Sequence, residues 1–368
     1  MSETPDPIPL MRLRLPGAAT LQPYLEEIDR NRWYTNYGPL ERRLIGALEQ
    51  HFDLPGGGAT SAANATIGLA LALMAVSDEP DGYCLMPGFT FVATAHAARM
   101  AGLTPWFADV SETGWALTPA IARAALDRID GAAAAVMPVG VFGAPVDAGA
   151  WDDFQRETGI PVVIDAAAGI DGARIGRCPT VISLHATKPL AAGEGAIVAS
   201  RDPDVVGEIM ARANFGFRGA RRAEAIGMNG KVSEYTAAVA LASLDLWPEN
   251  REQLSRVTAE YRSKLTGLTG VTLSPGFGDG WVSSTCNVAF SDPVADRIID
   301  SLRSRAIESR QWWSKGCHRE PAFSDCPCGD LAVVDALAER VIGLPYFAGL
   351  RPGDIDRIAG TLAGLLAR

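Results

Sequence analysis

The sequence predicts an α/β protein whose centre is a mostly parallel sheet with helices on both faces. Short apolar runs of strand length alternate with segments of helical periodicity through the first two thirds of the chain. The strand-like runs are apolar at nearly every position, which is typical of strands buried on both faces. After about residue 250 this alternation stops. We therefore expect a large domain over residues 1–248, including an extended N-terminal segment, and a smaller α+β domain over 249–368.

The expected helices follow from apolar residues spaced three and four apart and from residues that begin or end helices. Residues 40–52 show this spacing, and a proline with three glycines follows them. Small polar residues before Ile67 stand where a helix N-cap belongs. The helices expected in the large domain are 21–29, 40–52, 67–76, 89–99, 119–128, 148–158 and 234–246, and those in the small domain are 251–265, 293–305 and 354–367.

The expected strands are the short apolar runs between these helices. They are 82–86, 104–107, 133–139, 160–164, 179–184 and 195–199, with 271–273 and 285–290 in the small domain. Ligands of parallel sheets bind where the carboxyl ends of the strands meet. Asp165 and the loop that carries Lys188 each follow directly after such a run, so both are expected at the binding edge.

Composition excludes several classes of protein. Of the 368 residues, 48% are hydrophobic and 21% are charged, which is ordinary for a soluble globular chain. The net charge of −10 leaves no basic field for a nucleic-acid partner. No apolar run reaches the roughly 18 residues that would span a membrane, and the polar N-terminus is unlike a signal peptide. The six cysteines are dilute, which predicts reduced thiols and a cytoplasmic location.

Lys188 lies between two apolar runs and is the residue around which the chain is organised. A charged lysine in such a place is costly unless it is paired. An imine with an aldehyde cofactor removes much of that cost and provides an electron sink. The alternative is a lysine whose ammonium group reaches solvent.

Other residues match the remaining parts of such a cofactor. Small residues and Thr66 begin a helix, whose N–H groups suit a phosphate. Phe89 and Phe91 could stack on a flat ring. Asp165 ends a buried strand and needs a cationic partner, which a protonated pyridine nitrogen would provide. Together with Ser183 and Lys188, these residues indicate pyridoxal phosphate (PLP).

The chain resembles the DegT/DnrJ/EryC1/StrS family of sugar-nucleotide aminotransferases, which have the aspartate-aminotransferase fold (PLP-dependent transferase fold type I). The resemblance covers nearly the whole chain. The matching stretches are Asn64-Ala-Thr66 with 69–73, Pro87-Gly-Phe-Thr-Phe-Val-Ala-Thr94, 102–109, 138–145, Ile164-Asp-Ala-Ala167, Ser183-Leu-His-Ala-Thr-Lys188, Gly193-Glu-Gly195, Asn229-Gly-Lys-Val-Ser-Glu234 and Gly343-Leu-Pro-Tyr346.

The resemblance implies a role for each matching residue. Lys188 forms the Schiff base and moves the proton, and Asp165 pairs with the ring nitrogen. The other implied cofactor contacts are Ala65, Thr66 and Ser183 at the phosphate, Phe91 on the ring, and Asn229 at the phosphate of a neighbouring subunit. The last of these implies a homodimer with shared active sites. One position departs from the family, which often has Gln or His where this chain has Ala168, so a contact near the ring hydroxyl is missing or supplied elsewhere.

Cys317, His318, Cys326 and Cys328 form a cluster of possible metal ligands in the C-terminal third. Four such ligands could hold zinc in a tetrahedral site. The spacing lacks paired CxxC motifs, so we expect free thiols in a loop and no metal.

The substrate side is predicted from cations and aromatic residues, because a nucleotide diphosphate needs cations and its base can stack. The candidates are Tyr37, His185, Arg218, Arg310, Trp312 and His318, with Trp313 and Lys315 in the same segment as Arg310. A surface aromatic patch at a dimer interface is the alternative for this set.

These residues predict a PLP-dependent aminotransferase that moves an amino group from glutamate to a nucleotide-linked keto-sugar. The resemblance favours a dTDP-4-keto-6-deoxyhexose, and the form of residues 229–234 is closer to C4 than to C3 aminotransferases. Two alternatives stay open. One is another keto-substrate, such as a C3-keto sugar or a cyclitol, and the other is a non-catalytic regulator with the same fold.

Overall fold

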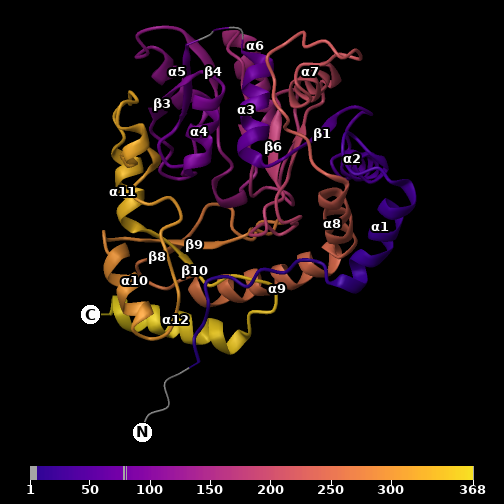
Figure 1. Cartoon of the computed structure of the whole chain (residues 1–368). Coiled ribbons are helices and arrows are strands. Elements are labelled where there is room, and N and C mark those ends of the chain that lie inside the picture. The colour runs from indigo at the N-terminus through magenta and orange to yellow at the C-terminus, as the bar shows by residue number, and fades with distance from the viewer. Residues whose placement is uncertain (1–5, 78, 80, 368) are drawn as a thin grey trace.

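The large sheet runs through the upper part of the molecule in Figure 1, which shows a computed structural model that describes residues 6–77, 79 and 81–367. Its strands lie in the order β3 (Thr104–Ala108), β2 (Tyr83–Pro87), β4 (Ala133–Val136), β5 (Ile164–Asp165), β6 (Thr180–Ser183), β7 (Ala196–Ala199) and β1 (Ala59–Ala62). Parallel bridges at Val136–Val162 and Val139–Asp165 connect the β4 side of the sheet to the β5 side.

The predicted α/β class with a mostly parallel sheet is confirmed. β2 pairs in parallel with β3 and β4, and β5 pairs in parallel with β6. The exception is β7, which is antiparallel to both of its neighbours. The loop with Lys188 joins β6 to β7 as a hairpin rather than through a crossover helix, so it lies at the carboxyl end of β6 beside the end of β5.

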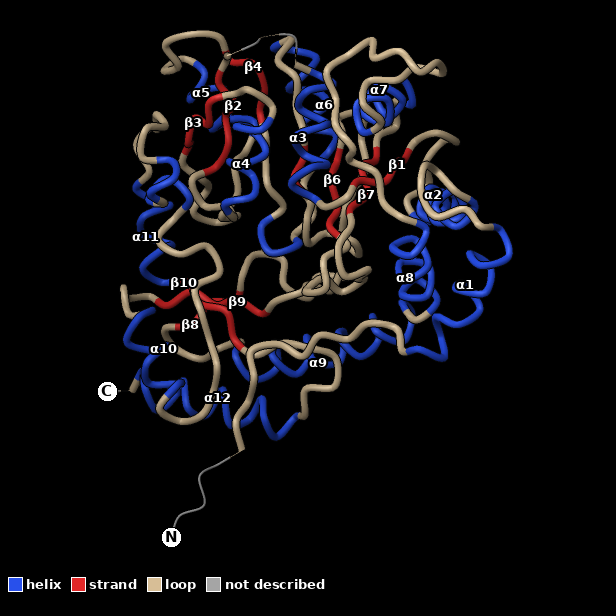
Figure 2. The backbone as a smooth tube through the Cα atoms, in the orientation of Figure 1, coloured by secondary structure: helices blue, strands red, loops and turns tan. Residues whose placement is uncertain are grey.

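Helices cover both faces of this sheet (Figures 1 and 2). They are α1 (Ala18–Asn31), α2 (Pro39–His51), α3 (Ala65–Val76), α4 (Val92–Met100), α5 (Pro119–Leu126), α6 (Ala148–Thr158), α7 (Pro203–Ala213) and α8 (Glu234–Asp245). The strands alternate between two apolar clusters: Val181 and Val198 pack with α3, whereas Ile182 and Ile197 belong to the cluster that contains residues of α2 and α8. α7 was not predicted, although Asp202 caps it and a proline begins it.

The C-terminal part contains a smaller antiparallel sheet with strands β8 (Val271–Leu273), β9 (Cys286–Phe290) and β10 (Val341–Leu344) in the order β10-β9-β8. Its helices are α9 (Trp247–Leu265), α10 (Ala295–Arg303), α11 (Ala332–Arg340) and α12 (Pro352–Leu366). Neither α11 nor β10 was predicted. α11 has nine residues and no side-chain cap, and it runs directly into β10, so no turn residue separates the two elements.

The N-terminal segment lies against the C-terminal part rather than against the large sheet. Ile8 bridges to Ile307, and the backbone N–H of Tyr346 donates to the carbonyl of Leu10 at 3.0 Å. The division of the chain at residue 248 stays a prediction, because α9 begins two residues after α8 ends without an intervening linker.

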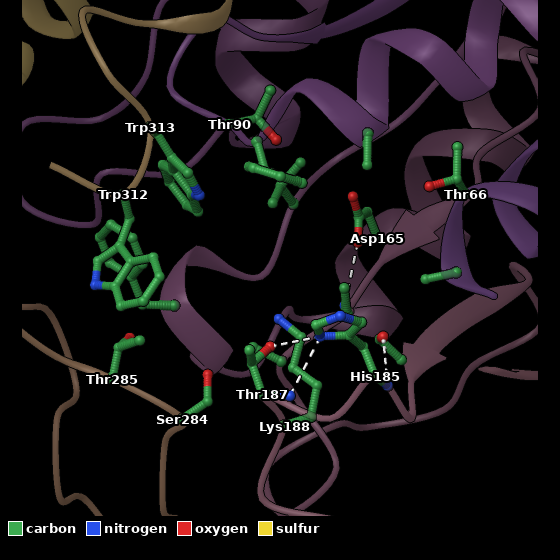
Figure 3. Close-up of a pocket in the computed structure, with 18 of the residues that line it drawn as sticks. Thr66, Thr90, Asp165, His185, Thr187, Lys188, Ser284, Thr285, Trp312 and Trp313 are labelled. Atoms are coloured by element: carbon green, nitrogen blue, oxygen red, sulfur yellow. Dashed lines mark hydrogen bonds between the residues drawn. The ribbon is translucent and has the colours of Figure 1, made fainter. Parts of the chain in front are cut away.

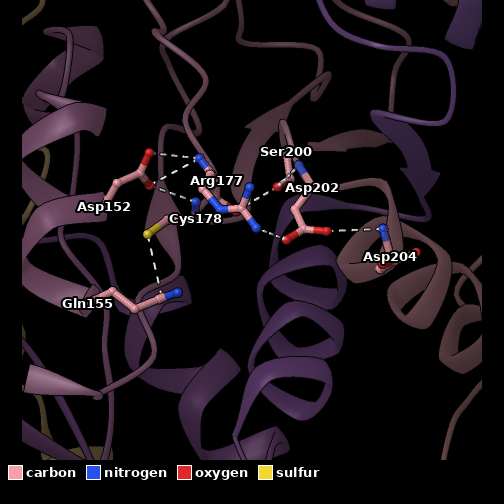
Figure 4. Close-up of polar contacts among 7 residues, drawn as sticks. All are labelled: Asp152, Gln155, Arg177, Cys178, Ser200, Asp202 and Asp204. Carbon is pink, nitrogen blue, oxygen red and sulfur yellow. Dashed lines mark hydrogen bonds and ion pairs between the residues drawn. The ribbon is translucent and has the colours of Figure 1, made fainter.

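Hydrogen bonds and an ion pair fix the loop that leads into β6 (Figure 4), and we call this group of Asp152, Arg177, Cys178 and Asp202 the polar clasp. The Asp152 carboxylate on α6 accepts from the backbone N–H groups of Arg177, at 2.9 and 3.0 Å, and of Cys178, at 2.9 Å. The Arg177 guanidinium pairs with Asp202 at 2.5 Å, ahead of α7. The clasp connects α6, β6 and α7, and so helps to fix the strand that ends at Ser183. No helix in the described part of the chain is long and apolar enough to cross a membrane.

Candidate active site

A cavity of about 900 Å³ opens at the carboxyl ends of the strands, between the large sheet and the C-terminal part. Figure 3 shows Trp312 and Trp313 on one side of it and Thr66 on the other, with Asp165 and Lys188 between them. Its lining is Met11, Asn64 to Ile67, Leu69, Thr90, Phe91, Ala93, Val139, Gly140, Phe142, Asp165, Ala167, Ala168, Ser183, His185, Thr187, Lys188, Glu194, Ser284, Thr285 and Arg310 to Ser314.

The first turn of α3 forms one end of the cavity. The Asn64 side chain accepts from the N–H of Ile67 at 2.9 Å and caps the helix. The N–H groups of Ala65 and Thr66 in this first turn have no acceptor within the helix. Ser183, at the end of β6, also borders the cavity. Its hydroxyl oxygen accepts from the N–H of His185 at 3.1 Å, which leaves its proton to donate to a ligand. These groups suit a phosphate.

Asp165 and Lys188 lie in the middle of the cavity and affect each other's protonation. Asp165 is 5% exposed, and burial raises the pKa of its carboxyl group while hydrogen bonds and Lys188 oppose that shift. Burial lowers the pKa of the Lys188 ammonium group, and Asp165 opposes that shift in turn. Lys188 is partly exposed because it borders the cavity. Desolvation therefore outweighs the mutual attraction for both residues.

Thr90 and Thr94 are site residues that the sequence reasoning did not single out. The hydroxyl of Thr94 donates to Asp165 Oδ2 at 2.8 Å, and its oxygen lies 2.7 Å from that of Thr90, which borders the cavity. The sequence feature that could have identified them is the presence of two threonines four residues apart in a segment that is otherwise apolar. α4 also begins at Val92, later than predicted, which leaves Thr90 and Phe91 on a loop that borders the cavity.

The far wall of the cavity is aromatic. The ring of Trp313 stacks on Phe142 with centroids 4.1 Å apart and meets the edge of Phe89 at 4.8 Å. The Arg310 guanidinium carbon lies 5.1 Å from the ring centre of Trp312. Phe89 is 2% exposed and belongs to the core, whereas Phe91 is 55% exposed at the rim. Of the two predicted stacking residues, only Phe91 borders the cavity.

His185 lies beside Lys188 in the hairpin loop. Its Nδ1 accepts from the N–H of Thr187 at 3.2 Å, so the proton of the neutral ring is on Nε2. Nε2 lies 3.5 Å from Glu194, which also borders the cavity. The pair is a polar group at the cavity rim.

Besides Phe89 and Lys315, four predicted site residues lie outside the cavity of this chain. The hydroxyl of Tyr37 donates to the carbonyl of Met210 at 3.1 Å, and Arg218 pairs with Glu208 on the surface. Asn229 bridges to Asn214 in a loop on the same side of the molecule. The fourth, His318, is treated separately below.

His318 is the clearest departure from the expected substrate side. Its side chain is 7% exposed and hydrogen-bonds to Asp335 at 3.1 Å, beneath Gly88. Lys315 pairs with Asp296 at 3.0 Å and also does not border the cavity. A turn at residues 312–315 sends the two indoles inward and these two cations elsewhere, which residue spacing alone does not reveal.

The cysteines near His318 do not converge on a metal site. Within the described residues, no three His, Cys, Asp or Glu side chains are grouped as metal ligands. Cys317 is buried, Cys328 is exposed, and Cys326 contacts Arg99 at 3.1 Å.

Comparison with known proteins identifies the family of this chain. Residues 17–363 match the model of the DegT/DnrJ/EryC1/StrS aminotransferase family. The chain is 34% identical over 373 residues to Protein Rv3402c of Mycobacterium tuberculosis, covering 96% of this chain and 89% of that protein. It is 27% identical to the dTDP-4-amino-4,6-dideoxy-D-glucose transaminase of Escherichia coli, covering 97% and 98%.

Solved structures agree with this family. A Bacillus cereus protein described as a PLP-dependent aminotransferase superposes with a TM-score of 0.91 at 29% identity, covering 97% of this chain and 100% of that one. DesI, solved with its TDP-sugar product, superposes with a TM-score of 0.87 at 31% identity, covering 99% and 94%. The chain therefore belongs to the DegT/DnrJ/EryC1/StrS aminotransferase family of PLP-dependent enzymes, which confirms the predicted family, fold, enzyme class and cofactor.

Proposed function

We propose that this protein moves an amino group from glutamate to the keto group of a nucleotide-linked deoxysugar, with a dTDP-4-keto-6-deoxyhexose as the favoured substrate. The observation that carries the proposal is the division of the cavity. Phosphate-binding and titratable groups line one end, and an aromatic wall with an arginine forms the other. A volume of about 900 Å³ is at the upper end of ordinary ligand sites, which suits a cofactor together with a large substrate.

The relatives support this substrate class through their names. Transaminases named for dTDP-4-amino-4,6-dideoxy-D-glucose match over nearly the whole chain, at 27% and 30% identity. A relative in Acidithiobacillus ferrooxidans is named for C3 amination of a UDP-sugar, at 28% identity. The C4 position and the dTDP nucleotide are therefore the finer part of our proposal.

The residues of the cavity fit PLP. The first turn of α3 and the Ser183 hydroxyl would hold its phosphate, Asp165 would face the ring nitrogen, and Phe91 would cover the ring. When bound, PLP supplies an aldehyde carbon that takes up the amino group and a ring that accepts electrons. Ala168 places only a methyl group at the cavity, so any polar contact expected at this position must come from another residue.

Lys188 is the group that moves the proton in this proposal. Because desolvation lowers its pKa, the free amine forms more readily than that of a lysine in water and can accept a proton from the bound substrate. Asp165 stabilises positive charge in the middle of the cavity. A general base with a lowered pKa beside a buried carboxylate is typical of catalytic sites.

Arg310 is the candidate for the substrate's negative charge. It borders the cavity over the face of Trp312, and among the described residues its guanidinium has no carboxylate within ion-pair distance. A planar guanidinium binds a phosphate or carboxylate through paired hydrogen bonds. We assign it to the diphosphate of the nucleotide, with the indoles of Trp312 and Trp313 beside the sugar and base.

A homodimer completes the proposal. Large apolar side chains are exposed on one side, near the start of α8 and the loop after α7, and they are Trp33, Tyr34, Met210, Phe215, Ile226 and Tyr235. We call this set the α8 patch. Contacts join its parts, since Tyr34 stacks on Tyr235 and Tyr37 bonds to Met210. We propose that a second copy of this chain covers the patch and that Asn229 reaches the neighbouring cavity.

An absorbance spectrum before and after glutamate tests the first half of the reaction. The protein loaded with PLP should show a band at roughly 410–430 nm that moves to about 330 nm with glutamate. Lys188→Ala should remove this response, whereas Lys315→Ala, a lysine outside the cavity, should keep it. Absence of any cofactor band after addition of PLP would sink the enzyme proposal and favour a regulatory protein.

A panel of keto-substrates tests the second half. The aminated enzyme should be discharged by dTDP-4-keto-6-deoxyglucose faster than by a C3-keto sugar nucleotide or a keto-cyclitol. Turnover of the cyclitol alone would overturn the sugar-nucleotide assignment and leave the aminotransferase intact.

A further inference from the structure

Asp165 receives its side-chain hydrogen bond from α4, a helix that the proposed mechanism does not use. Thr94 donates to Asp165 Oδ2 at 2.8 Å, and the N–H of Ala167 donates to Oδ1 at 3.1 Å. Thr94 is fully buried, and Thr90 is 1% exposed. The hydroxyl oxygens of the two threonines lie 2.7 Å apart. Two successive hydrogen bonds therefore link Thr90, at the cavity, through Thr94 to the Asp165 carboxylate, and we call this series the hydroxyl chain.

The direction of this chain follows from the number of protons. An ionised carboxylate only accepts hydrogen bonds, so the single hydroxyl proton of Thr94 is directed to Asp165. Thr90 must then donate to Thr94. The oxygen of Thr90, which borders the cavity, keeps a lone pair that can accept a hydrogen bond from a ligand. If Asp165 were protonated, the same chain could run in the opposite direction.

Two donors from different elements restrain the carboxylate plane. Ala167 lies on the loop after β5, and Thr94 lies in the first turn of α4. Each Asp165 oxygen accepts one hydrogen bond, whereas a carboxylate can accept about four hydrogen bonds in all. Both oxygens therefore keep lone pairs for a group in the cavity. Burial raises the Asp165 pKa, and the Thr94 bond is the first of the interactions that oppose this.

We propose that Thr94, supported by Thr90, is a positioning residue that aims the Asp165 carboxylate into the cavity and keeps it ionised there. This inference rests on the proposed function only in that Asp165 faces the PLP ring, and it does not depend on the sugar. The hydroxyl chain supplies polar support from α4, while Ala168 on the loop after Asp165 contributes only a methyl group.

The experiment compares Thr94→Val, which removes the hydroxyl at similar volume, with Thr94→Ser, which keeps it. Thr90→Val removes only the supporting donor. Thr258→Val is the matched control, because Thr258 is a buried threonine, 5% exposed, whose hydroxyl bonds to Leu254 and Tyr346 in the C-terminal part. PLP affinity and the pH titration of the bound cofactor's absorbance are measured for each variant.

Thr94→Val should weaken PLP binding about tenfold, since a hydrogen bond to a charged group is lost. The midpoint of its absorbance titration should move to lower pH by about one unit, because a less available carboxylate holds the ring proton less firmly. Thr94→Ser should restore the PLP affinity to within about twofold of the wild type and the titration midpoint to within a few tenths of a pH unit. Thr90→Val should give values between those of Thr94→Val and the wild type. Thr258→Val should match the wild type.

Unfolding of the cofactor-free protein provides a readout that does not involve the loaded enzyme. A carboxyl group with a raised pKa in the folded state loses stability as pH rises from its unfolded value, about 3.9, through its folded value. Loss of the Thr94 bond raises the folded pKa further. The fall in melting temperature as pH rises above about 4 should therefore be larger in Thr94→Val than in the wild type.

Three results would overturn the inference. They are a Thr94→Val protein with the wild-type titration midpoint, a Thr94→Ser protein as impaired as Thr94→Val, and a Thr258→Val protein with the same shift. If the wild type does not bind PLP, the inference and the proposed function fail together. If it binds PLP and does not aminate a sugar nucleotide, only the proposed substrate fails, and the titration still decides the role of Thr94.

Discussion

Lys188 and Asp165 show how burial of individual side chains prepares them for chemistry. In water, a lysine and an aspartate side by side would both be charged. Here desolvation shifts both pKa values toward the neutral forms, and the attraction between the two residues only partly opposes it. Residues whose pKa values are shifted in this way by burial and a charged neighbour cluster at functional sites.

The contribution of Lys188 to the stability of the cofactor-free protein should grow as pH rises toward about 10. Between the lowered folded pKa of Lys188 and its unfolded value of about 10.4, the unfolded chain binds the extra proton, so stability rises with pH. Lys188→Met should remove this slope in urea unfolding. Lys264→Met, at an exposed lysine paired with Asp356, is the control that should keep it. Parallel slopes in the wild type and Lys188→Met would show that Lys188 titrates normally.

Arg310 should affect the sugar nucleotide more than glutamate. Loss of a paired hydrogen bond to a phosphate typically costs tenfold or more in binding. We expect Arg310→Gln to raise the KM for the keto-sugar nucleotide about tenfold with little change in kcat, and Arg310→Lys to recover part of it. Stopped-flow measurement of each half-reaction separates the two substrates. A larger effect on the glutamate half-reaction would reassign Arg310 to the amino donor.

Among the helices, α3 connects local capping with the proposed phosphate site. The Asn64 side chain accepts the N–H of Ile67, which leaves the earlier N–H groups to the cavity. The helix also lies close to the sheet at Gly68, where a Cβ would come within 3.1 Å of Val181 and 3.3 Å of Val198. The cap and the glycine therefore place the positive end of the helix over the strand ends.

Asn64→Ala should cost about 1 kcal/mol in stability and also weaken PLP binding several-fold, because the helix end loses both its cap and its fixed position. Thr118→Ala is the matched control. Thr118 caps α5 through the N–H of Ile121 at 3.3 Å and does not border the cavity. Its loss should cost a similar amount of stability at unchanged PLP affinity. Equal PLP affinity in Asn64→Ala and wild type would exclude α3 as the phosphate site.

For the chain as a whole, the α8 patch defined above is the surface that we propose a second copy of this chain covers. Ile226 is 80% exposed, and Phe215 and Tyr235 are each 47% exposed. Large exposed apolar patches often mark interaction sites, which supports the proposed dimer. Asn229 and Arg218 also lie toward this side, in the loop between α7 and α8, so their predicted roles depend on a second chain.

Light scattering after size exclusion should give a mass near twice that of the 38.9 kDa chain. Ile226→Glu should shift the protein toward the monomer and lower transamination, because it places a charge where apolar surface is buried. Leu13→Glu is the control, at an apolar residue that is 56% exposed in the N-terminal segment, away from this patch. A wild-type protein that remains monomeric at micromolar concentration would contradict the shared active site.

The sequence was sufficient for the α/β class, because buried strands and helix starts leave local patterns, and its resemblance to a known family was sufficient for the family and the cofactor. Lys188 between β6 and β7, Asp165 at the end of β5, and Thr66 in the first turn of α3 all lie in one cavity. Each of these follows from a short segment of chain. The sequence did not predict α11 and β10, because α11 has no side-chain cap and no turn separates it from β10.

Long-range packing determined the rest. The Thr90–Thr94–Asp165 chain joins residues up to 75 positions apart, and only the pairing of strands brings α4 to β5. His318 and Lys315 have the chemistry of substrate ligands, yet a turn directs them away from the cavity. Arg310 and Trp312 remain in the cavity because Arg310 pairs with Gly343 on β10. Residue type sets what a side chain can do, and burial and strand pairing determine which partner it meets.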